Sequence, residues 1–149
     1  MLNSIEEILE ELRMRSPEVS FCITSKQENA MMKVDDYILC PVRDVTKKQK
    51  KEIDAYIDAL KATGRNVHSY RDVDQSDPTG YNIVMGQFEG MKECEVVHVF
   101  WDVNSAGSHC DLGMAMAFGK EIKLVKCYND NDGKSYWKAL KEYVKRSKK

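Results

Sequence analysis

Short apolar runs alternate with longer amphipathic segments along most of the chain. The run Tyr37–Val42 is continuously apolar, which is typical of a strand buried on both faces of a parallel sheet. The next segment, Thr46–Gly64, places apolar residues at helical spacing against a charged face, with a threonine cap at its start and a glycine at its end. The same pattern predicts further strands at 66–70, 95–101 and 122–127, and further helices at 81–93, 105–118 and 134–146.

This alternation of strands and helices predicts the fold class. It favours an α/β domain with right-handed crossovers, namely a doubly wound, flavodoxin- or Rossmann-like parallel sheet, which we expect to have five strands. Ligands of such sheets bind outside the carboxyl ends of the strands. We therefore expect Pro41–Arg43, the loop that begins at Arg71 and the turn at Ser105 to converge on one site. A G-x-G-x-x-G motif is absent, so an ordinary dinucleotide fold is not supported.

The first 35 residues look like an addition to this domain. Ser4 and Glu7 form a capping box pattern, and apolar residues recur at helical spacing up to Arg15. We expect a short strand at Phe21–Thr24. We therefore divide the chain into an N-terminal helical extension, residues 1–35, and a main domain, residues 36–149.

Composition narrows the classes of partner. The 149 residues have a formal net charge of −1, so no basic field favours nucleic acid. The longest apolar runs have the length of strands, and the polar, acidic N-terminus does not resemble a signal peptide. Five cysteines without any C-x-x-C pair suggest reduced thiols rather than disulfides or a zinc site. We expect a cytoplasmic protein with no membrane partner, metal or cofactor.

The stretch from Ser105 to Lys120 is the strongest candidate for a functional segment. An apolar strand ends, a Ser/Gly turn follows, and a helix rich in small residues begins. The free N–H groups of a first helical turn bind anions such as phosphate. Asp111 lies about one turn into this helix, where the macrodipole favours the ionised form of its carboxyl group. The plain structural alternative is that Ser108 is only a cap and Asp111 only stabilises the start of the helix.

Three segments together resemble a known family. They are Tyr37–Arg43 (YILCPVR), Glu95–Trp101 (EVVHVFW) and Ser105–Lys120 (SAGSHCDLGMAMAFGK). This set is similar to the nucleoside 2-deoxyribosyltransferase superfamily, which includes the nucleoside 5′-monophosphate N-hydrolases. The resemblance extends over roughly Asp36 to Ser135, and its third motif is the most specific.

The resemblance implies a nucleophile. In the family, a glutamate before Leu-Gly attacks C1′ of the sugar and displaces the base, and this chain has Asp111 at that position. An aspartate is shorter by one C–C bond, roughly 1.5 Å. An ionised carboxylate can nevertheless form a glycosyl ester or stabilise an oxocarbenium-like transition state.

The resemblance also implies a phosphate site. Six residues before the nucleophile, the monophosphate hydrolases carry a serine, which corresponds to Ser105. Together with Gly107, Ser108 and Arg43, this serine would favour a 5′-phosphate. The hydrolases receive a second serine from a neighbouring subunit, and Ser135 is similarly placed, which implies at least a homodimer.

Two further positions bear on the chemistry. Where the family has an aspartate that helps to protonate the leaving base, this chain has Gln87, and an amide cannot act as a general acid. Glu89, Asp74 or Asp77 could replace it from nearby. Tyr37 is suited either to core packing or to a family-like contact with the sugar or the base.

We therefore expect an enzyme that cleaves or transfers the N-glycosidic bond of a nucleoside or nucleoside 5′-monophosphate. Its site would comprise Asp111, Gln87 and Tyr37 for catalysis, and Arg43, Ser105, Gly107, Ser108 and Ser135 for substrate binding. The alternative is a nucleotide-binding or sensing module with little or no turnover, which the departures at Asp111 and Gln87 favour. In both cases the partner is a small molecule.

Overall fold

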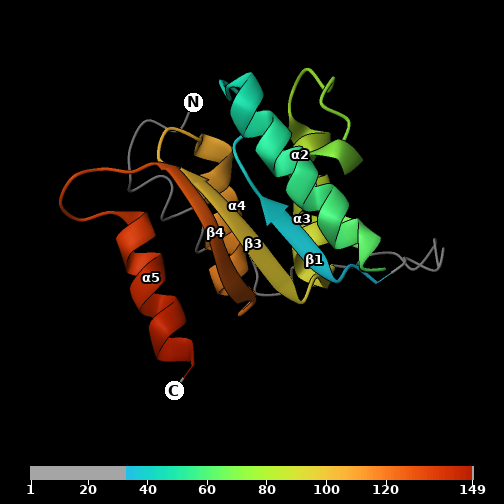
Figure 1. Ribbon diagram of the computed structural model, residues 1–149. Helices are drawn as coiled ribbons and strands as arrows, with labels where there is room; N and C mark the ends of the chain where they lie inside the picture. The colour runs from blue at the N-terminus through green and yellow to red at the C-terminus, as the bar shows by residue number, and fades with distance from the viewer. Residues whose placement is uncertain (1–32, 149) are drawn as a thin grey trace, which may run out of the picture. The chain divides into compact units, whose positions relative to one another are not determined.

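The computed structural model describes residues 33–148 (Figure 1). In chain order the elements are β1 (Asp36–Leu39), α2 (Lys47–Ala62), β2 (Val67–His68), the short 3₁₀ helix η1 (Tyr70–Asp72), α3 (Tyr81–Glu93), β3 (Val96–Asp102), α4 (Ala106–Ala117), β4 (Glu121–Asn129) and α5 (Tyr136–Ser147). The helix predicted up to Arg15 and the strand predicted at Phe21–Thr24 lie outside the described residues. The separate extension of residues 1–35 therefore stays a prediction.

The described strands form one sheet in the order β2-β1-β3-β4, and every neighbouring pair is parallel. This order is that of doubly wound, flavodoxin-like sheets. The predicted fold class is confirmed. The described residues hold four strands rather than the five expected.

Two strands are shorter than the apolar pattern predicts. β1 ends at Leu39 instead of Val42, because it lies between two other strands and Pro41 has no N–H to continue the ladder. β2 ends before Ser69, whose backbone N–H donates to the carboxylate of Asp72 at 2.8 Å. This contact is half of a capping box, which turns the chain from β2 into η1.

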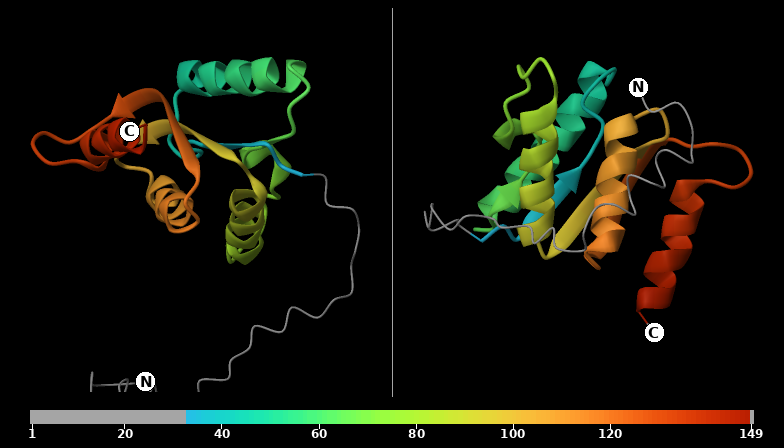
Figure 2. Two further views of the ribbon diagram at one scale, coloured as in Figure 1. Left: turned by 90° about the horizontal axis from the view of Figure 1, so that it is seen from below. Right: turned by 180° about the vertical axis from the view of Figure 1, so that it is seen from behind.

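Helices cover both faces of the sheet, as Figure 2 shows for α2 on one side and α3 and α4 on the other. On the α2 side, Ile53 and Ile57 are at most 1% exposed and belong to one buried cluster with residues of β1 and β3. On the other side, Met91, Leu112 and Leu140 join a second buried cluster from α3, α4 and α5. The sheet is therefore buried on both faces, which explains the continuous apolar runs of its strands.

The strand order reverses between β1 and β3, where the chain turns one way toward β2 and the other way toward β4. A crevice at the carboxyl ends of these two strands is the usual ligand site of such a fold. The segments that leave β1 and β3 there are Cys40–Asp44 and the turn from Val103 to Ser105. Within residues 33–148, none of the helices is both long and apolar enough to cross a membrane.

Candidate active site

A pocket of about 490 Å³ opens at the carboxyl ends of β1 and β3. Its walls come from the segment after β1, the start of α4 and one side of α3. Of the residues predicted for the site, Arg43, Gln87, Ser105, Gly107 and Asp111 line this pocket. The convergence expected from the sequence is thus observed for the β1 and β3 segments and for the loop that begins at Arg71, whose Gln75 and Gly80 line the same pocket.

A tyrosine and an aspartate, 74 positions apart in the sequence, meet at the base of the site. The phenol of Tyr37 on β1 donates a hydrogen bond to Oδ2 of Asp111 on α4, at 2.9 Å. Both side chains are buried, with exposed fractions of 2% and 4%. Among the described residues, Oδ1 of Asp111 has no hydrogen-bond partner. One carboxylate oxygen is therefore held in place, whereas the other is not engaged.

The pKa of Asp111 differs from the sequence-based expectation. The macrodipole at the start of α4 was expected to favour the ionised form, but burial raises the pKa to about 6, and the hydrogen bond from Tyr37 lowers it only in part. Most of the Asp111 carboxyl groups are still ionised above pH 7. Burial and the nearby charge of Asp111 raise the pKa of Tyr37, so the phenol remains a donor.

The Ser/Gly turn is built as the first turn of α4. Ser105 is the N-cap, and its side chain accepts hydrogen bonds from the backbone N–H of Ser108 at 3.3 Å and from the Ser108 hydroxyl at 2.9 Å. Ser108 is only 1% exposed and is not among the residues that line the pocket. It orients Ser105 from below the turn. Ala106 and Gly107, whose first-turn amides have no intrahelical acceptor, are among the residues that line the pocket.

The segment after β1 contributes charge to the pocket mouth. Arg43 is exposed and is the one cationic residue in the lining of the described pocket. The next residue, Asp44, has a φ of 60°, a conformation that is uncommon for residues other than glycine and that is often found at functional sites. Arg43 is therefore placed to meet an anion that approaches the N-terminus of α4.

Gln87 lines the pocket from α3, but the acids expected to replace it do not. Glu89, Asp74 and Asp77 are outside the lining. The carboxylate of Asp77 instead accepts from the backbone N–H groups of Thr79 and Asn82 at the start of α3. None of these three acids therefore lies in the wall beside Gln87.

Two acidic residues that the sequence analysis did not select line the pocket, Asp44 and Asp102. Asp102 is the last residue of β3, and its Oδ1 accepts from the backbone N–H of Asn104 at 2.9 Å. Its position directly after an apolar strand was a usable signal, because strand ends lie at the ligand edge of this fold. The same logic had selected Arg43.

Ser135 and Arg71 lie outside the pocket of this chain. Ser135 is the N-cap of α5, where it accepts from the backbone N–H of Lys138 at 3.1 Å and donates to Asp130 at 2.9 Å. Arg71 pairs with Asp54 and with a second aspartate of α2. The guanidinium of Arg71 is held by α2, but the loop that begins at Arg71 does reach the site, because Gln75 and Gly80 line the pocket. The contact of Ser135 with a neighbouring subunit stays a prediction.

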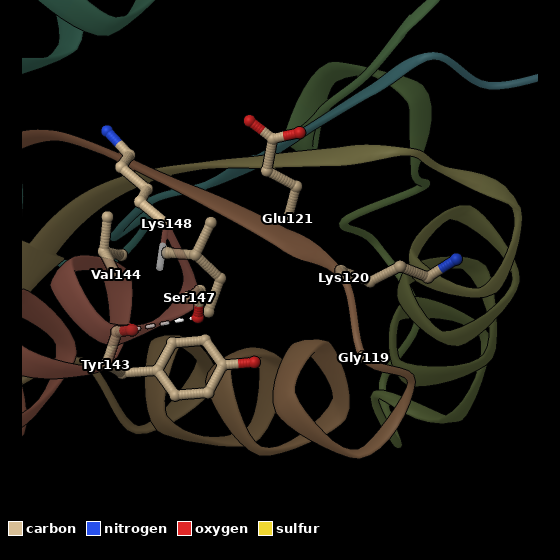
Figure 3. Close-up of a pocket in the computed structure, with 8 residues that line it drawn as sticks. Gly119, Lys120, Glu121, Tyr143, Val144, Ser147 and Lys148 are labelled. Atoms are coloured by element: carbon tan, nitrogen blue, oxygen red, sulfur yellow. Dashed lines mark hydrogen bonds between the residues drawn. The ribbon is translucent and has the colours of Figure 1, made fainter.

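A second hollow, of about 320 Å³, lies at the amino end of β4 (Figure 3). It is formed by the end of α4, the start of β4 and the end of α5. Its Ser147 hydroxyl donates to the backbone carbonyl of Tyr143 at 2.9 Å. The hollow contains none of the residues predicted for the site, so the pocket at the carboxyl edge is the candidate active site.

Fold and site together define a doubly wound α/β domain with a buried tyrosine–aspartate pair at the switch point of its sheet. No protein-family profile matches the chain, and no curated protein matches it. Among solved structures, the chain is similar to the CMP N-glycosidase BcmB of Clostridium botulinum, with 23% identity over 73% of this chain and 99% of that chain, and a TM-score of 0.46. At this identity and TM-score, the likeness assigns no roles to residues of this chain.

Proposed function

We propose that this protein cleaves the N-glycosidic bond of a nucleoside 5′-monophosphate, with Asp111 as the nucleophile. The observation that supports this most is the geometry of Asp111. Its Oδ2 is fixed by the Tyr37 phenol, its Oδ1 is buried without a partner among the described residues, and Asp111 is one of the residues that line the switch-point pocket. A carboxylate that is held in place but incompletely paired suits attack on an electrophilic carbon.

The start of α4 would bind the phosphate. Ser105 and Gly107, in the first turn of α4, line the same pocket as Asp111, and Arg43 contributes a cation to it. Helix N-termini and guanidinium groups both stabilise phosphate dianions. Asp111 follows Ser105 by six residues on the same helix, so the phosphate and C1′ of one nucleotide would lie against successive turns of α4.

The reaction would proceed in two displacements. A carboxylate oxygen of Asp111 forms a bond to C1′ as the C1′–N bond breaks, and the electron pair of that bond stays on the base nitrogen, which takes up a proton. A water molecule, or the nitrogen of a second base, then attacks C1′ and releases Asp111 as a carboxylate, with the proton of the attacking group passing to solvent. Water as acceptor gives hydrolysis and a second base gives transfer.

A group other than Gln87 would have to protonate the leaving base. The amide of Gln87 can hydrogen-bond a base but cannot supply a proton. Asp102 and Asp44, the further carboxyl groups in the described lining, are the candidates for the proton donor. Asp102 is the better placed of the two, because β3 fixes its backbone.

The second candidate function is a nucleotide-binding or sensing module. The presence of an amide, Gln87, in the wall where an acid was expected favours it. Binding without base release would distinguish such a module from the enzyme. Calorimetry with the same nucleotides would show a Kd that is unchanged by long incubation.

The test of the enzyme is product formation. Purified protein would be incubated with a panel of ribo- and deoxyribonucleoside 5′-monophosphates, and free base would be measured by chromatography. Base release that disappears in Asp111→Asn and persists in Asp58→Asn, an exposed carboxylate of α2, is the expected result. No base from any nucleotide at high enzyme concentration would contradict the proposal.

We also propose a homodimer, in keeping with the neighbouring-subunit contact implied for Ser135. The outer surfaces of α3 and α4 expose large apolar side chains, with Val84 and Met85 on α3 and Met116 and Phe118 at the end of α4. Because Val84 also lines the pocket, a second copy on this surface would help to enclose the substrate. Analytical ultracentrifugation should show a dimer that Met116→Glu dissociates, whereas a monomeric parent protein would contradict the dimer.

The compartment that suits this proposal is the cytoplasm. Cys110 is a free, exposed thiol on α4, and exposed free thiols persist in reducing compartments. Localisation of the tagged protein in cells would test this assignment.

A further inference from the structure

His68 lies directly behind the tyrosine of the site. It is the last residue of β2 and pairs in register with Tyr37 on β1. The two rings are stacked, with centroids 5.4 Å apart and an interplanar angle of 22°. His68 does not line the pocket, so a direct contact with substrate is not part of its role.

The ring of His68 also lies close to α3. A Cβ atom on Gly90 would lie 2.5 Å from Cδ2 and 2.7 Å from Nε2 of His68, closer than any real contact. Only a glycine at position 90 therefore leaves room for the ring. Gly90 costs α3 about 1 kcal/mol relative to alanine, so its presence needs a reason, and the ring of His68 supplies one.

Hydrogen bonding does not explain why position 68 is a histidine. Nε2 of His68 is buried and has no partner among the described residues. Burial lowers the pKa of His68, so the ring is neutral around pH 7. A buried nitrogen without a partner is costly, whereas a leucine or phenylalanine would avoid that cost if apolar packing were the whole purpose. The stacking of its rigid, flat ring on Tyr37 is the remaining explanation for a histidine at this position.

We propose that His68 is a positioning residue for the active site: its ring, seated in the gap at Gly90, fixes the ring of Tyr37 so that the phenol reaches Oδ2 of Asp111. The chain of contacts runs from α3 through β2 and β1 to α4, and each link is a packed or hydrogen-bonded pair. The effect on turnover rests on the proposed function, but the effect on the Tyr37–Asp111 hydrogen bond does not.

The test follows the ionisation of Asp111 itself. With ¹³C-labelled aspartate, the Asp111 carboxyl signal is identified by its loss in Asp111→Asn and is titrated in the wild type. The titration is then repeated in Tyr37→Phe, His68→Ala, His68→Phe and Gly90→Ala. Tyr37 and Cys40, the neighbours coupled to this carboxylate, remain protonated throughout, because burial raises the pKa of both groups.

Loss of the Tyr37 hydrogen bond should raise the midpoint of Asp111, because that bond favours the ionised form. We expect a rise of up to about one pH unit in Tyr37→Phe. A similar rise is expected in His68→Ala and Gly90→Ala, and a midpoint near that of the wild type in His68→Phe, whose ring restores the stack. Should His68→Ala not fold, Gly90→Ala gives the same measurement.

The control for a general effect of alanine in α3 is Gly86→Ala, whose Cβ would meet Val73 at 3.3 Å and not His68. An unchanged midpoint in both His68→Ala and Gly90→Ala would overturn the inference, as would an unchanged midpoint in Tyr37→Phe.

This result is independent of whether a substrate is found, because the titration needs no turnover. If base release is observed, His68→Ala should lower kcat about tenfold with KM unchanged, and the acid limb of its pH profile should move with the Asp111 midpoint. A shifted midpoint in a protein that releases no base from any nucleotide would leave the positioning role intact and remove only the proposed function.

Discussion

Two buried aspartates lie on opposite sides of strand β1 and differ in the number of their hydrogen-bond partners. Asp36 belongs to β1, and Asp111 contacts β1 through Tyr37. Asp36, on the α2 side of the sheet, is 1% exposed and accepts hydrogen bonds from Arg65 at 2.9 Å, in a bidentate pair, and from Nε2 of His98 at 2.9 Å. Asp111, on the other side, is 4% exposed and accepts only the phenol of Tyr37 among the described residues. Burial is nearly equal, but the number of partners is not.

The two pKa values reflect this difference. Burial raises the pKa of Asp36, but the hydrogen bonds of Arg65 and His98 outweigh it, so the net pKa is below the usual value. For Asp111, burial prevails and the pKa rises to about 6. A fully paired carboxylate stabilises the fold and is chemically quiet, whereas a poorly paired one destabilises the fold and remains reactive. Active sites commonly retain such unfavourable groups.

The largest expected effect is the loss of turnover in Asp111→Asn. An amide of the same shape cannot attack C1′, so base release should fall on the order of 10³-fold or more. The free energy of unfolding should not fall at pH 7.5, because the variant removes a buried and underpaired charge. Chromatography of released base and urea unfolding measure the two quantities. A variant that kept activity, or lost it only by unfolding, would remove the contrast between the two aspartates.

The next largest effect is the loss of stability in Asp36→Asn. The substitution removes the buried charge that pairs with the partly exposed Arg65 and weakens the bond to His98, so we expect a loss of about 2 to 3 kcal/mol in the free energy of unfolding. The activity of the molecules that remain folded should be near that of the wild type. Asp58→Asn, in a largely exposed pair with Arg71, is the matched control and should cost less than about 1 kcal/mol.

A smaller effect is that the contributions of Asp111 and Asp36 to stability depend on pH in opposite directions. Because the folded pKa of Asp111, about 6, exceeds its ordinary value of 3.8, the folded state binds this proton more tightly than the unfolded state. Its contribution to stability is then fully favourable below about pH 4 and is lost as the pH rises through 6, by at most about 3 kcal/mol. The lowered pKa of Asp36 acts in the reverse sense, since its contribution is lost as the pH falls below its folded value.

Urea unfolding of the wild type and of Asp111→Asn between pH 4.5 and 7.5 isolates the first of these contributions. The stability of the variant relative to the wild type should grow as the pH rises. A difference that stays constant with pH would mean that the carboxyl group of Asp111 does not titrate in this range.

Much of the fold could be predicted from the sequence, because parallel strands that are buried on both faces consist of continuous apolar runs. The ends of β1 and β2 were less predictable. Pro41 ends β1, which is a central strand, and the Ser69–Asp72 cap ends β2. Both features lie within runs of residues that otherwise resemble a strand. The strand predicted at Phe21–Thr24 lies outside the described residues.

The site was predictable where a residue directly follows a strand, as for Arg43, or begins a helix, as for Ser105. It was less so where a role depends on packing between distant segments. The contact of Tyr37 with Asp111 spans 74 positions, and no local pattern reveals that burial would outweigh the macrodipole at Asp111. Nor does any local pattern reveal that Asp77 is engaged by the backbone of α3.

The smallest expected effect is a kinetic difference between two serines that have the same structural role. Ser105 and Ser135 are both N-caps, and each accepts a hydrogen bond from a backbone N–H three residues later, at 3.3 and 3.1 Å. Replacing either one by alanine should cost about 1 kcal/mol of stability, as should Thr46→Ala, the cap of α2 outside the pocket. In stability measurements the three variants should therefore be alike.

Their kinetics should differ, because only Ser105 lines the pocket of its own chain. Ser105→Ala should raise KM for the 5′-monophosphate more than for the matching nucleoside, since the phosphate is the group it would contact. Ser135→Ala should do the same only if the dimer brings this serine to the partner's pocket. If Ser135→Ala instead has the KM of Thr46→Ala for both substrates, the cap of α5 is structural alone, and the phosphate is bound within one chain.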